Sequence, residues 1–158
     1  LQASFDFRNS ERMVPLEREL ELVKAYLYIE QERFADRLRV LWDVPEELLS
    51  TPVPPLSIQT LVENGVRHGI MRKPEGGTLR IAARAVGTIV EIAVSDDGVG
   101  IEERAASALE DRPGKLGGIG LRNTDRRLHQ TFGRGLDIAS VPGQGTTVTI
   151  RARRHMQS

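Results

Sequence analysis

Two adjacent carboxylates follow an apolar, strand-like run in the segment VSDDGVGI, residues 94–101. Gly98 and Gly100 come next, so the backbone there can approach another molecule closely. An ionised carboxylate only accepts hydrogen bonds, which suits Asp96 or Asp97 to an amino group such as the exocyclic amine of adenine. Because Asp-Gly is also a common turn sequence, the segment alone leaves an ordinary turn open.

Two further glycine-rich segments could bind phosphate. The segment KLGGIGLRN, residues 115–123, places glycines before the start of a helix, where backbone N–H groups and the helix dipole favour an anion. The segment PGQGTT, residues 142–147, has the glycines of a close approach and also those of a plain hairpin loop. Neither segment identifies a site by itself.

A fourth candidate is the segment LVENGVRHG, residues 61–69. The amide oxygen of Asn64 can bind magnesium, a hard cation that prefers oxygen ligands. Arg67 and His68 can contact phosphate oxygens, and His68 lies four residues from Asn64 on the same helix face. A solvated helix end with favourable basic residues is the alternative interpretation.

The composition limits the classes of protein that need to be considered. The chain has 158 residues, which is enough for one domain with a single core. Its 22 acidic and 22 basic residues balance, so no overall charge favours nucleic acid as a partner. It has no cysteine, which excludes disulfides and thiolate chemistry. No apolar run reaches the roughly 18 residues of a membrane span.

Hydrophobic periodicity predicts the elements that must position these residues. Helices are expected at 15–34, 56–70 and 121–132, and strands at 38–44, 78–86, 88–96, 135–141 and 145–154. The charged, glycine-ended stretch 102–118 shows no strand alternation. Strands interleaved with helices predict an α+β fold, a two-layer α/β sandwich whose mostly antiparallel sheet has helices on one face.

The order of the motifs changes how each one is interpreted. An asparagine helix, then D-x-G-x-G, then G-x-G-L before a helix, and then G-x-G-T before the last strand resembles the GHKL ATPases. This family includes gyrase B, Hsp90, histidine kinases and MutL. The resemblance implies the Bergerat sandwich with a mobile ATP lid, here residues 102–118. It also implies that Asp96 accepts from the adenine amine, while Asp97 is a variable, solvated turn residue.

The N-terminal part of the chain resembles one branch of that family. The segments VPLERELELVKAYLYIEQERFADRL and VPPLSIQTLVENGVRHGI, with GGIGLRNTDRRL, are similar to LytS/YehU-type sensor histidine kinases over about residues 14–152. This implies transfer of the γ-phosphoryl group of ATP to a histidine and onward transfer to an aspartate of a response regulator. It further implies a homodimeric parent that is anchored in a membrane, with this part in the cytoplasm.

The resemblance also implies domain boundaries and residue roles. Residues 1–35 would end the dimerisation and histidine-phosphotransfer region, and residues 36–158 would form the catalytic ATP-binding domain. Asn64 would ligate Mg²⁺, Glu63 would orient water or the metal shell, and Arg67 would contact phosphate. The residues expected to bind ATP are Asn64, Arg67, His68, Asp96, Gly98, Gly100, Lys115, Gly118, Ile119, Gly120, Leu121, Asn123, Gly143, Gly145 and Thr146.

Some features of the family are missing from the chain. The N-P-H-F-x-F-N pattern around the acceptor histidine is absent, so the acceptor is expected upstream of Leu1. Hydrolytic members place a carboxylate one helical turn before the asparagine, and Thr60 stands there instead. Three alternatives stay open: a GHKL serine kinase of the anti-sigma-factor type, a nucleotide-dependent interaction module without activity, and an unrelated α/β binding domain.

Overall fold

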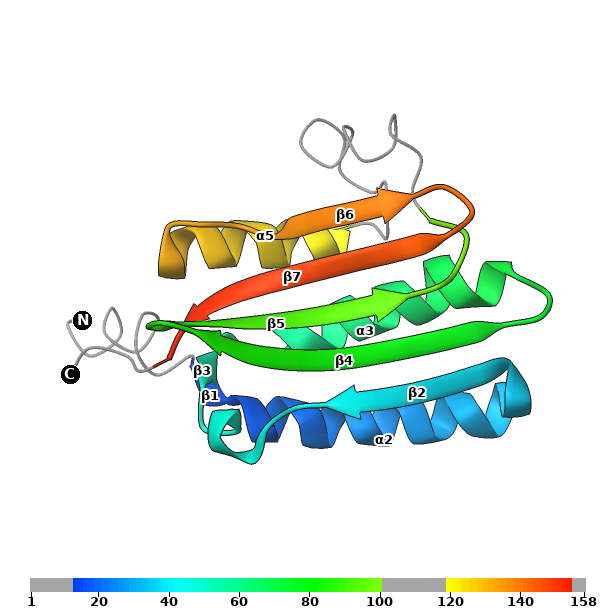
Figure 1. The fold of residues 1–158 in the computed structure, drawn as a ribbon, viewed down its shortest axis with the longest axis horizontal. Coiled ribbons are helices and arrows are strands. Elements are labelled where there is room, and N and C mark those ends of the chain that lie inside the picture. The colour runs from blue at the N-terminus through cyan, green and yellow to red at the C-terminus, as the bar shows by residue number, and fades with distance from the viewer. Residues whose placement is uncertain (1–12, 101–118, 155–158) are drawn as a thin grey trace.

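A five-stranded sheet with the strand order β2-β4-β5-β7-β6 forms one layer of the molecule (Figure 1). The computed structural model describes residues 13–100 and 119–154. Strand β2 pairs with β4 in parallel, and the other neighbouring strands are antiparallel. The strands are β2 Leu38–Asp43, β4 Gly77–Val86, β5 Ile89–Asp96, β6 Asp137–Val141 and β7 Gly145–Arg153. The expected mixed, mostly antiparallel sheet is therefore confirmed.

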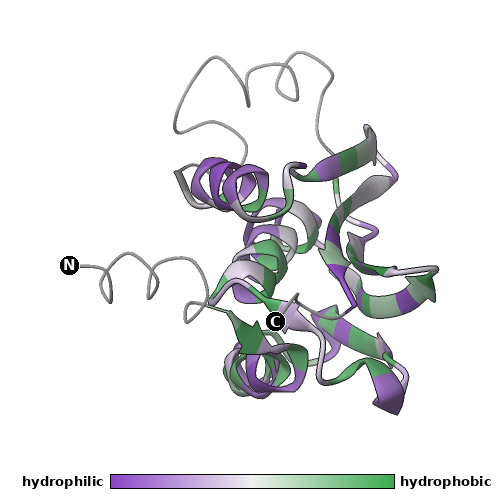
Figure 2. Cartoon of the chain, turned by 90° about the vertical axis from the view of Figure 1, so that its left-hand side faces the viewer, coloured by the Kyte–Doolittle hydropathy of each residue, from purple (hydrophilic) through white to green (hydrophobic). Residues whose placement is uncertain are grey.

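The second layer consists of helices that cover one face of this sheet (Figure 2). These are α2 Leu16–Phe34, α3 Ser57–Asn64 and α5 Ile119–Phe132. Alternate residues of each strand point toward the helices, as the pleat requires. In β7, for example, Val148, Ile150 and Ala152 are buried. The two-layer α/β sandwich predicted from the sequence is thus observed.

Helix α2 is part of the same core as the sheet. Its apolar stripe contributes Leu16, Leu20, Val23 and Leu27, all buried in one cluster with residues of α3, α5 and the strands. Burying a leucine side chain contributes about 1.5–3 kcal/mol. The stripe therefore fixes α2 firmly against the helix that follows it, α3.

Two features differ from the expected elements. The helix expected at 56–70 is α-helical only to Asn64, then continues as a π-helical turn at Gly65–Gly69 and a 3₁₀ turn at Ile70–Arg72. In addition, β1 Val14–Pro15 pairs antiparallel with β3 Pro52–Val53. Strands of two residues carry no alternation, so periodicity cannot reveal them.

The expected lid, residues 102–118, lies outside the described residues. Across residues 13–100 and 119–154, no helix is both long and apolar enough to cross a membrane.

Candidate functional site

Asp96 is the last residue of β5 and lies between Leu79 of β4 and Thr146 of β7. Its carboxylate accepts a hydrogen bond from the backbone N–H of Gly98 at 2.9 Å and another from the backbone of Thr146. Burial raises the pKa of the Asp96 carboxyl to about 6, although these two hydrogen bonds oppose the shift. A carboxylate removed from water in this way forms stronger hydrogen bonds than an exposed one.

Two glycines of the π-helical turn lie directly against this carboxylate. A Cβ atom at Gly69 would lie 2.5 Å from Oδ1 of Asp96, and one at Gly65 would lie 3.4 Å from Oδ2. A larger residue at Gly69 would therefore displace the carboxylate. Neither glycine is among the candidate residues from the sequence, although their four-residue spacing places both on one helix face.

The D-x-G-x-G loop is hydrogen-bonded to the asparagine segment on one side and to the PGQGTT segment on the other. The backbone N–H of Val99 donates to the carbonyl oxygen of Gly69 at 3.4 Å, and the carbonyl oxygen of Val99 accepts from the N–H of Gly143 at 2.6 Å. A Cβ atom at Gly98 would overlap the backbone of Gly69, and one at Gly100 would overlap that of Val141. In the described structure these glycines thus permit a close approach between protein segments.

Asp97 has a structural role that the sequence does not reveal. Its exposed side chain accepts the backbone N–H of Thr78 at 2.7 Å, and its own N–H donates to the carbonyl of Thr78 at 3.3 Å. These two hydrogen bonds link the start of β4 to the end of β5, and Asp97 also lies in the expected turn.

The polar residues of the asparagine segment lie on α3 and on the turn that follows it. The amide oxygen of Asn64 is buried and has no hydrogen-bond partner among the described residues. Glu63 accepts a hydrogen bond from Nε2 of Gln59 at 2.9 Å. Arg67 is exposed, whereas burial and the charges of Arg72 and Arg67 lower the pKa of His68 from 6.5. The lowered pKa favours the neutral imidazole in this structure, and its N–H can donate to a phosphate oxygen.

The third glycine motif approaches Asp96 from β7. Gly145 has a φ of 128°, and a Cβ atom there would overlap the backbone of Asp96. Thr146 is buried, and its hydroxyl lies 2.9 Å from Oγ of Ser140. The threonine thus supports Asp96 through its backbone.

The second glycine motif is described only in part. Lys115 and Gly118 lie outside the described residues, and α5 begins at Ile119. At Gly120, a Cβ atom would lie 3.2 Å from Cγ2 of Thr60, so α5 starts beside α3. Leu121 is fully buried in the core, while Asn123 is exposed.

Three segments that are distant in the sequence thus meet around Asp96: residues 64–69, 96–100 and 143–146. The site offers the desolvated carboxylate of Asp96, the exposed guanidinium of Arg67 and the amide oxygen of Asn64, which has no hydrogen-bond partner in the part of the chain that the structure describes. Within 13–100 and 119–154, no group of three or more His, Asp or Glu residues could hold a metal ion. A metal here would therefore take few protein ligands, as magnesium does when phosphates and water complete its coordination.

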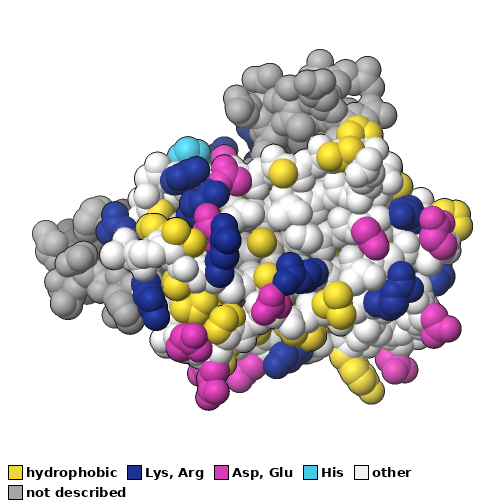
Figure 3. Space-filling model, in the orientation of Figure 1, with side chains coloured by type: hydrophobic (Ala, Val, Ile, Leu, Met, Phe, Trp, Pro, Cys, Tyr) yellow, Lys and Arg dark blue, Asp and Glu magenta, His cyan; other side chains and the backbone are white. Residues whose placement is uncertain are grey.

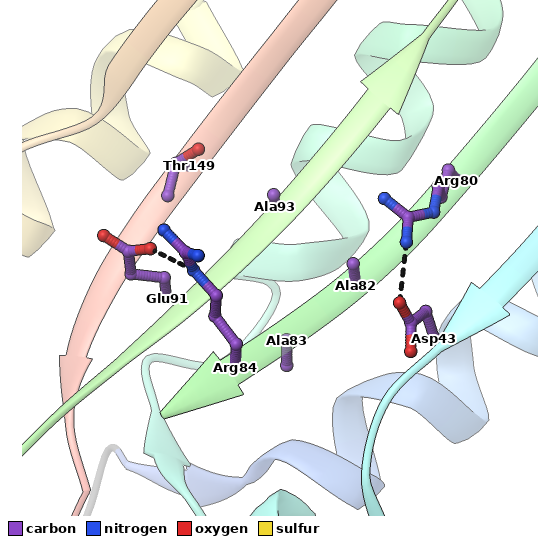
Figure 4. A pocket seen from close by; sticks show the side chains of 8 residues that line it. All are labelled: Asp43, Arg80, Ala82, Ala83, Arg84, Glu91, Ala93 and Thr149. Carbon is purple, nitrogen blue, oxygen red and sulfur yellow. Dashed lines mark hydrogen bonds and ion pairs between the residues drawn. The ribbon is translucent and has the colours of Figure 1, made fainter. Parts of the chain in front are cut away.

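A hollow of about 350 Å³ lies on the opposite, uncovered face of the sheet (Figure 4). Its charged residues are already paired: Arg80 with Asp43 at 2.6 Å and Arg84 with Glu91 at 2.8 Å. Acidic and basic side chains are interspersed over this face, without a continuous patch of either sign (Figure 3). The hollow contains none of the candidate residues, so the site is the one around Asp96.

Two family models match the chain. The model described as "Histidine kinase-, DNA gyrase B-, and HSP90-like ATPase" matches residues 56–156, and the model described as "Histidine kinase" matches residues 1–38. The first model covers all the described residues of the site around Asp96.

Curated relatives and solved structures agree with these matches. The chain is 34% identical to "Sensor histidine kinase YpdA" of Escherichia coli, over 96% of this chain and 28% of the relative. It is 37% identical to "Sensor protein LytS" of Oceanobacillus iheyensis, over 78% of this chain and 22% of the relative. The catalytic domain of the histidine kinase ThkA superposes with a TM-score of 0.69 at 16% identity, over 90% of this chain and 96% of that domain.

Proposed function

The chain belongs to the histidine kinase-, DNA gyrase B- and HSP90-like ATPase family, and on this premise we propose that it is the Mg-ATP-binding catalytic part of a sensor histidine kinase. It spans about a quarter of the length of the two curated relatives described above. In this proposal the γ-phosphoryl group passes to a histidine outside the chain, and an aspartate of a response regulator then receives it. The acceptor histidine lies in the same homodimeric parent.

The convergence of three motif segments on Asp96 is the observation that supports this function most directly. In the proposal, Asp96 accepts a hydrogen bond from the exocyclic amine of adenine. Its carboxylate is desolvated, and in its ionised form it has acceptors but no donor. Gly65 and Gly69 keep side chains away from this carboxylate. The nucleotide base therefore lies at the end of β5, beside the π-helical turn.

Asn64 binds magnesium in the proposal. A buried amide oxygen without a hydrogen-bond partner is destabilising unless a ligand satisfies it, and magnesium prefers oxygen atoms as ligands. Bound magnesium supplies neutralisation of the phosphate charges. Arg67 adds a second cation, and Glu63 orients the water around the metal.

Other backbone and side-chain groups complete the phosphate site in the proposal. His68 contributes an N–H donor, and the start of α5 contributes backbone N–H groups and the positive end of its dipole. The proposed phosphate contacts of the second motif are Lys115, Gly118, Ile119, Gly120, Leu121 and Asn123. The end of the site that binds the base is formed around Asp96 by the first and third glycine motifs, with Gly98, Gly100, Gly143, Gly145 and Thr146.

Phosphoryl transfer to a protein side chain suits the site better than hydrolysis. Activation of water needs a general base, and Thr60 occupies the position one helical turn before Asn64. Its hydroxyl donates to the carbonyl oxygen of Leu56 at 2.8 Å, so this side chain is hydrogen-bonded within its own helix. The two family-model matches lie at 1–38 and 56–156, whereas α2 at Leu16–Phe34 is buried in the same core as the sheet. The proposed boundary near residue 35 therefore separates two sequence families within one packed core.

Calorimetric titration with ATP, with and without magnesium, tests the site. Asp96→Asn should weaken binding about ten- to a hundredfold in both conditions, because a charge-assisted hydrogen bond to the base is lost. Asn64→Ala should remove the gain that magnesium gives and leave metal-free binding nearly unchanged. Asp97→Asn is the matched control, since its amide oxygen can still accept from Thr78. Equal losses of ATP affinity in Asp96→Asn and Asp97→Asn would contradict the assignment of Asp96 as the residue that binds adenine.

A further inference from the structure

Helix α3, which ends at Asn64, has no capping side chain of its own at its start. Its N-cap residue is Leu56, which has a φ of 66° and an apolar side chain. The hydroxyl of Ser57 donates to the carbonyl oxygen of Pro54 at 2.6 Å and so does not cap either. Helix starts leave backbone N–H groups without partners, and these require an acceptor when they are buried.

Glu19 of α2 supplies that acceptor from 37 residues away. One carboxylate oxygen accepts the N–H of Leu56 at 2.8 Å, and the other accepts the N–H of Ile58 at 3.1 Å. The side chain is 1% exposed. A carboxylate so buried is stable only when both oxygens are hydrogen-bonded, and here it also faces the positive end of the α3 dipole.

Helices α2 and α3 come close to each other a second time, further along. Tyr26, two turns after Glu19, is half-buried and lies within electrostatic range of Glu63 and Arg67. Burial, with the charges of Glu30 and Glu63, raises the pKa of the Tyr26 phenol to about 12. Seven residues rise about 10 Å along a helix, from Glu19 to Tyr26 in α2 and from Leu56 to Glu63 in α3, so the two helices run in the same direction as far as Glu63.

We propose that Glu19 is a positioning residue that couples a displacement of α2 to the magnesium ligand Asn64. A cap from the helix itself would move with that helix, whereas a cap from α2 fixes α3 to α2. The histidine kinase family model covers α2, at residues 1–38, and ends before α3. A shift of α2 caused by the preceding part of the protein therefore changes where Asn64 lies. This inference rests on the proposed function of the site.

Glu19→Gln tests the coupling because it keeps the shape of the side chain. One oxygen can still accept, but the new NH₂ group faces a backbone N–H and cannot accept from it. Glu21→Gln is the matched control, with the same change of charge on an exposed residue of the same helix. Both variants are compared with the native chain under conditions where denaturation curves show all three to be folded.

Two readouts separate positioning from a merely structural role. The gain in ATP affinity from magnesium should fall about tenfold in Glu19→Gln, with metal-free affinity within about twofold of native. The side-chain amide signals of Asn64 in NMR spectra should shift without any nucleotide, while the amide signal of Gly98 stays in place. Glu21→Gln should match the native chain in both.

Several results would overturn the inference. Equal losses of metal-free and magnesium-dependent binding, or unshifted Asn64 signals, would give Glu19 a structural role only. If Glu19→Gln does not fold, Glu19→Asp keeps a carboxylate with one methylene fewer and should show the same shift in smaller size. A native chain that gains nothing from magnesium would instead contradict the proposed function, and the Asn64 signals would still test the coupling.

Discussion

Replacing Asp96 with asparagine should make the free energy of unfolding less dependent on pH. Burial raises the pKa of this carboxyl from 3.8 to about 6 in the folded chain. A group with a raised pKa stabilises the folded state fully below its unfolded-state pKa, and loses this contribution as the pH rises through the folded-state value. The contribution of protonated Asp96 is thus complete below about pH 3.8 and absent above about pH 6.

The shift of about two pKa units corresponds to about 3 kcal/mol over the whole pH window. Between pH 4.5 and 7.5, about 2 kcal/mol of this change is accessible. Urea denaturation of the native chain and of Asp96→Asn across this range gives the difference in unfolding free energy. Asparagine does not titrate, so the difference reports the titration of Asp96 together with its coupling to the charges of Asp97 and Lys73.

A difference in unfolding free energy that stays constant from pH 4.5 to 7.5 would refute this account of Asp96. Asp97→Asn gives an independent check, because the charge of Asp97 is one of the causes that raise the Asp96 pKa. In Asp97→Asn the free energy of unfolding should still fall as the pH rises, but the midpoint of the fall should lie at a lower pH, because the Asp96 pKa is less raised.

Three further predictions concern nucleotide binding. The affinity for ATP, measured by calorimetry, should fall below about pH 6, because protonation of Asp96 removes the charge-assisted hydrogen bond from the adenine amine, and Asp96→Asn should lose this part of the pH dependence and keep that of the phosphates; a native chain with the same pH dependence as Asp96→Asn would count against this contact. Gly69→Ala should cost about 1–3 kcal/mol of stability and weaken ATP binding, because its Cβ would lie 2.5 Å from Oδ1 of Asp96; native stability in denaturation and native affinity together would exclude this packing role. Residues 102–118 should exchange their amide hydrogens rapidly without nucleotide and slowly with a non-hydrolysable ATP analogue, since few large apolar residues hold them; strong protection in the empty chain would exclude a lid there.

Much of the fold follows from periodicity. The helix expected at 15–34 is α2 Leu16–Phe34, and the strand expected at 78–86 is β4 Gly77–Val86. Such long elements bury one face, and the burial determines their pattern. The π-helical turn at Gly65–Gly69 is different, because it keeps helical spacing in the sequence while changing which residues face the sheet.

The site itself is less accessible to sequence reasoning. Spacing does not show that the segments of Asn64, Asp96 and Thr146 meet, since tertiary contacts bring them together, and only the family resemblance indicated it. Glu19 lies on the buried stripe of α2, three residues after Leu16, and a charged residue there should have a buried partner. Periodicity marks that position but cannot identify the start of α3 as the partner.

Phosphoryl transfer in solution tests the central proposal most directly. The chain is incubated with magnesium and ATP labelled at the γ-phosphate, together with a polypeptide from the same parent that contains the acceptor helix. The proposal predicts an acid-labile, base-stable label on a histidine of that polypeptide, none on the chain itself, and no transfer with Asn64→Ala. An acid-stable label on serine, or an acid-labile label on His68, His129 or His155, would contradict it.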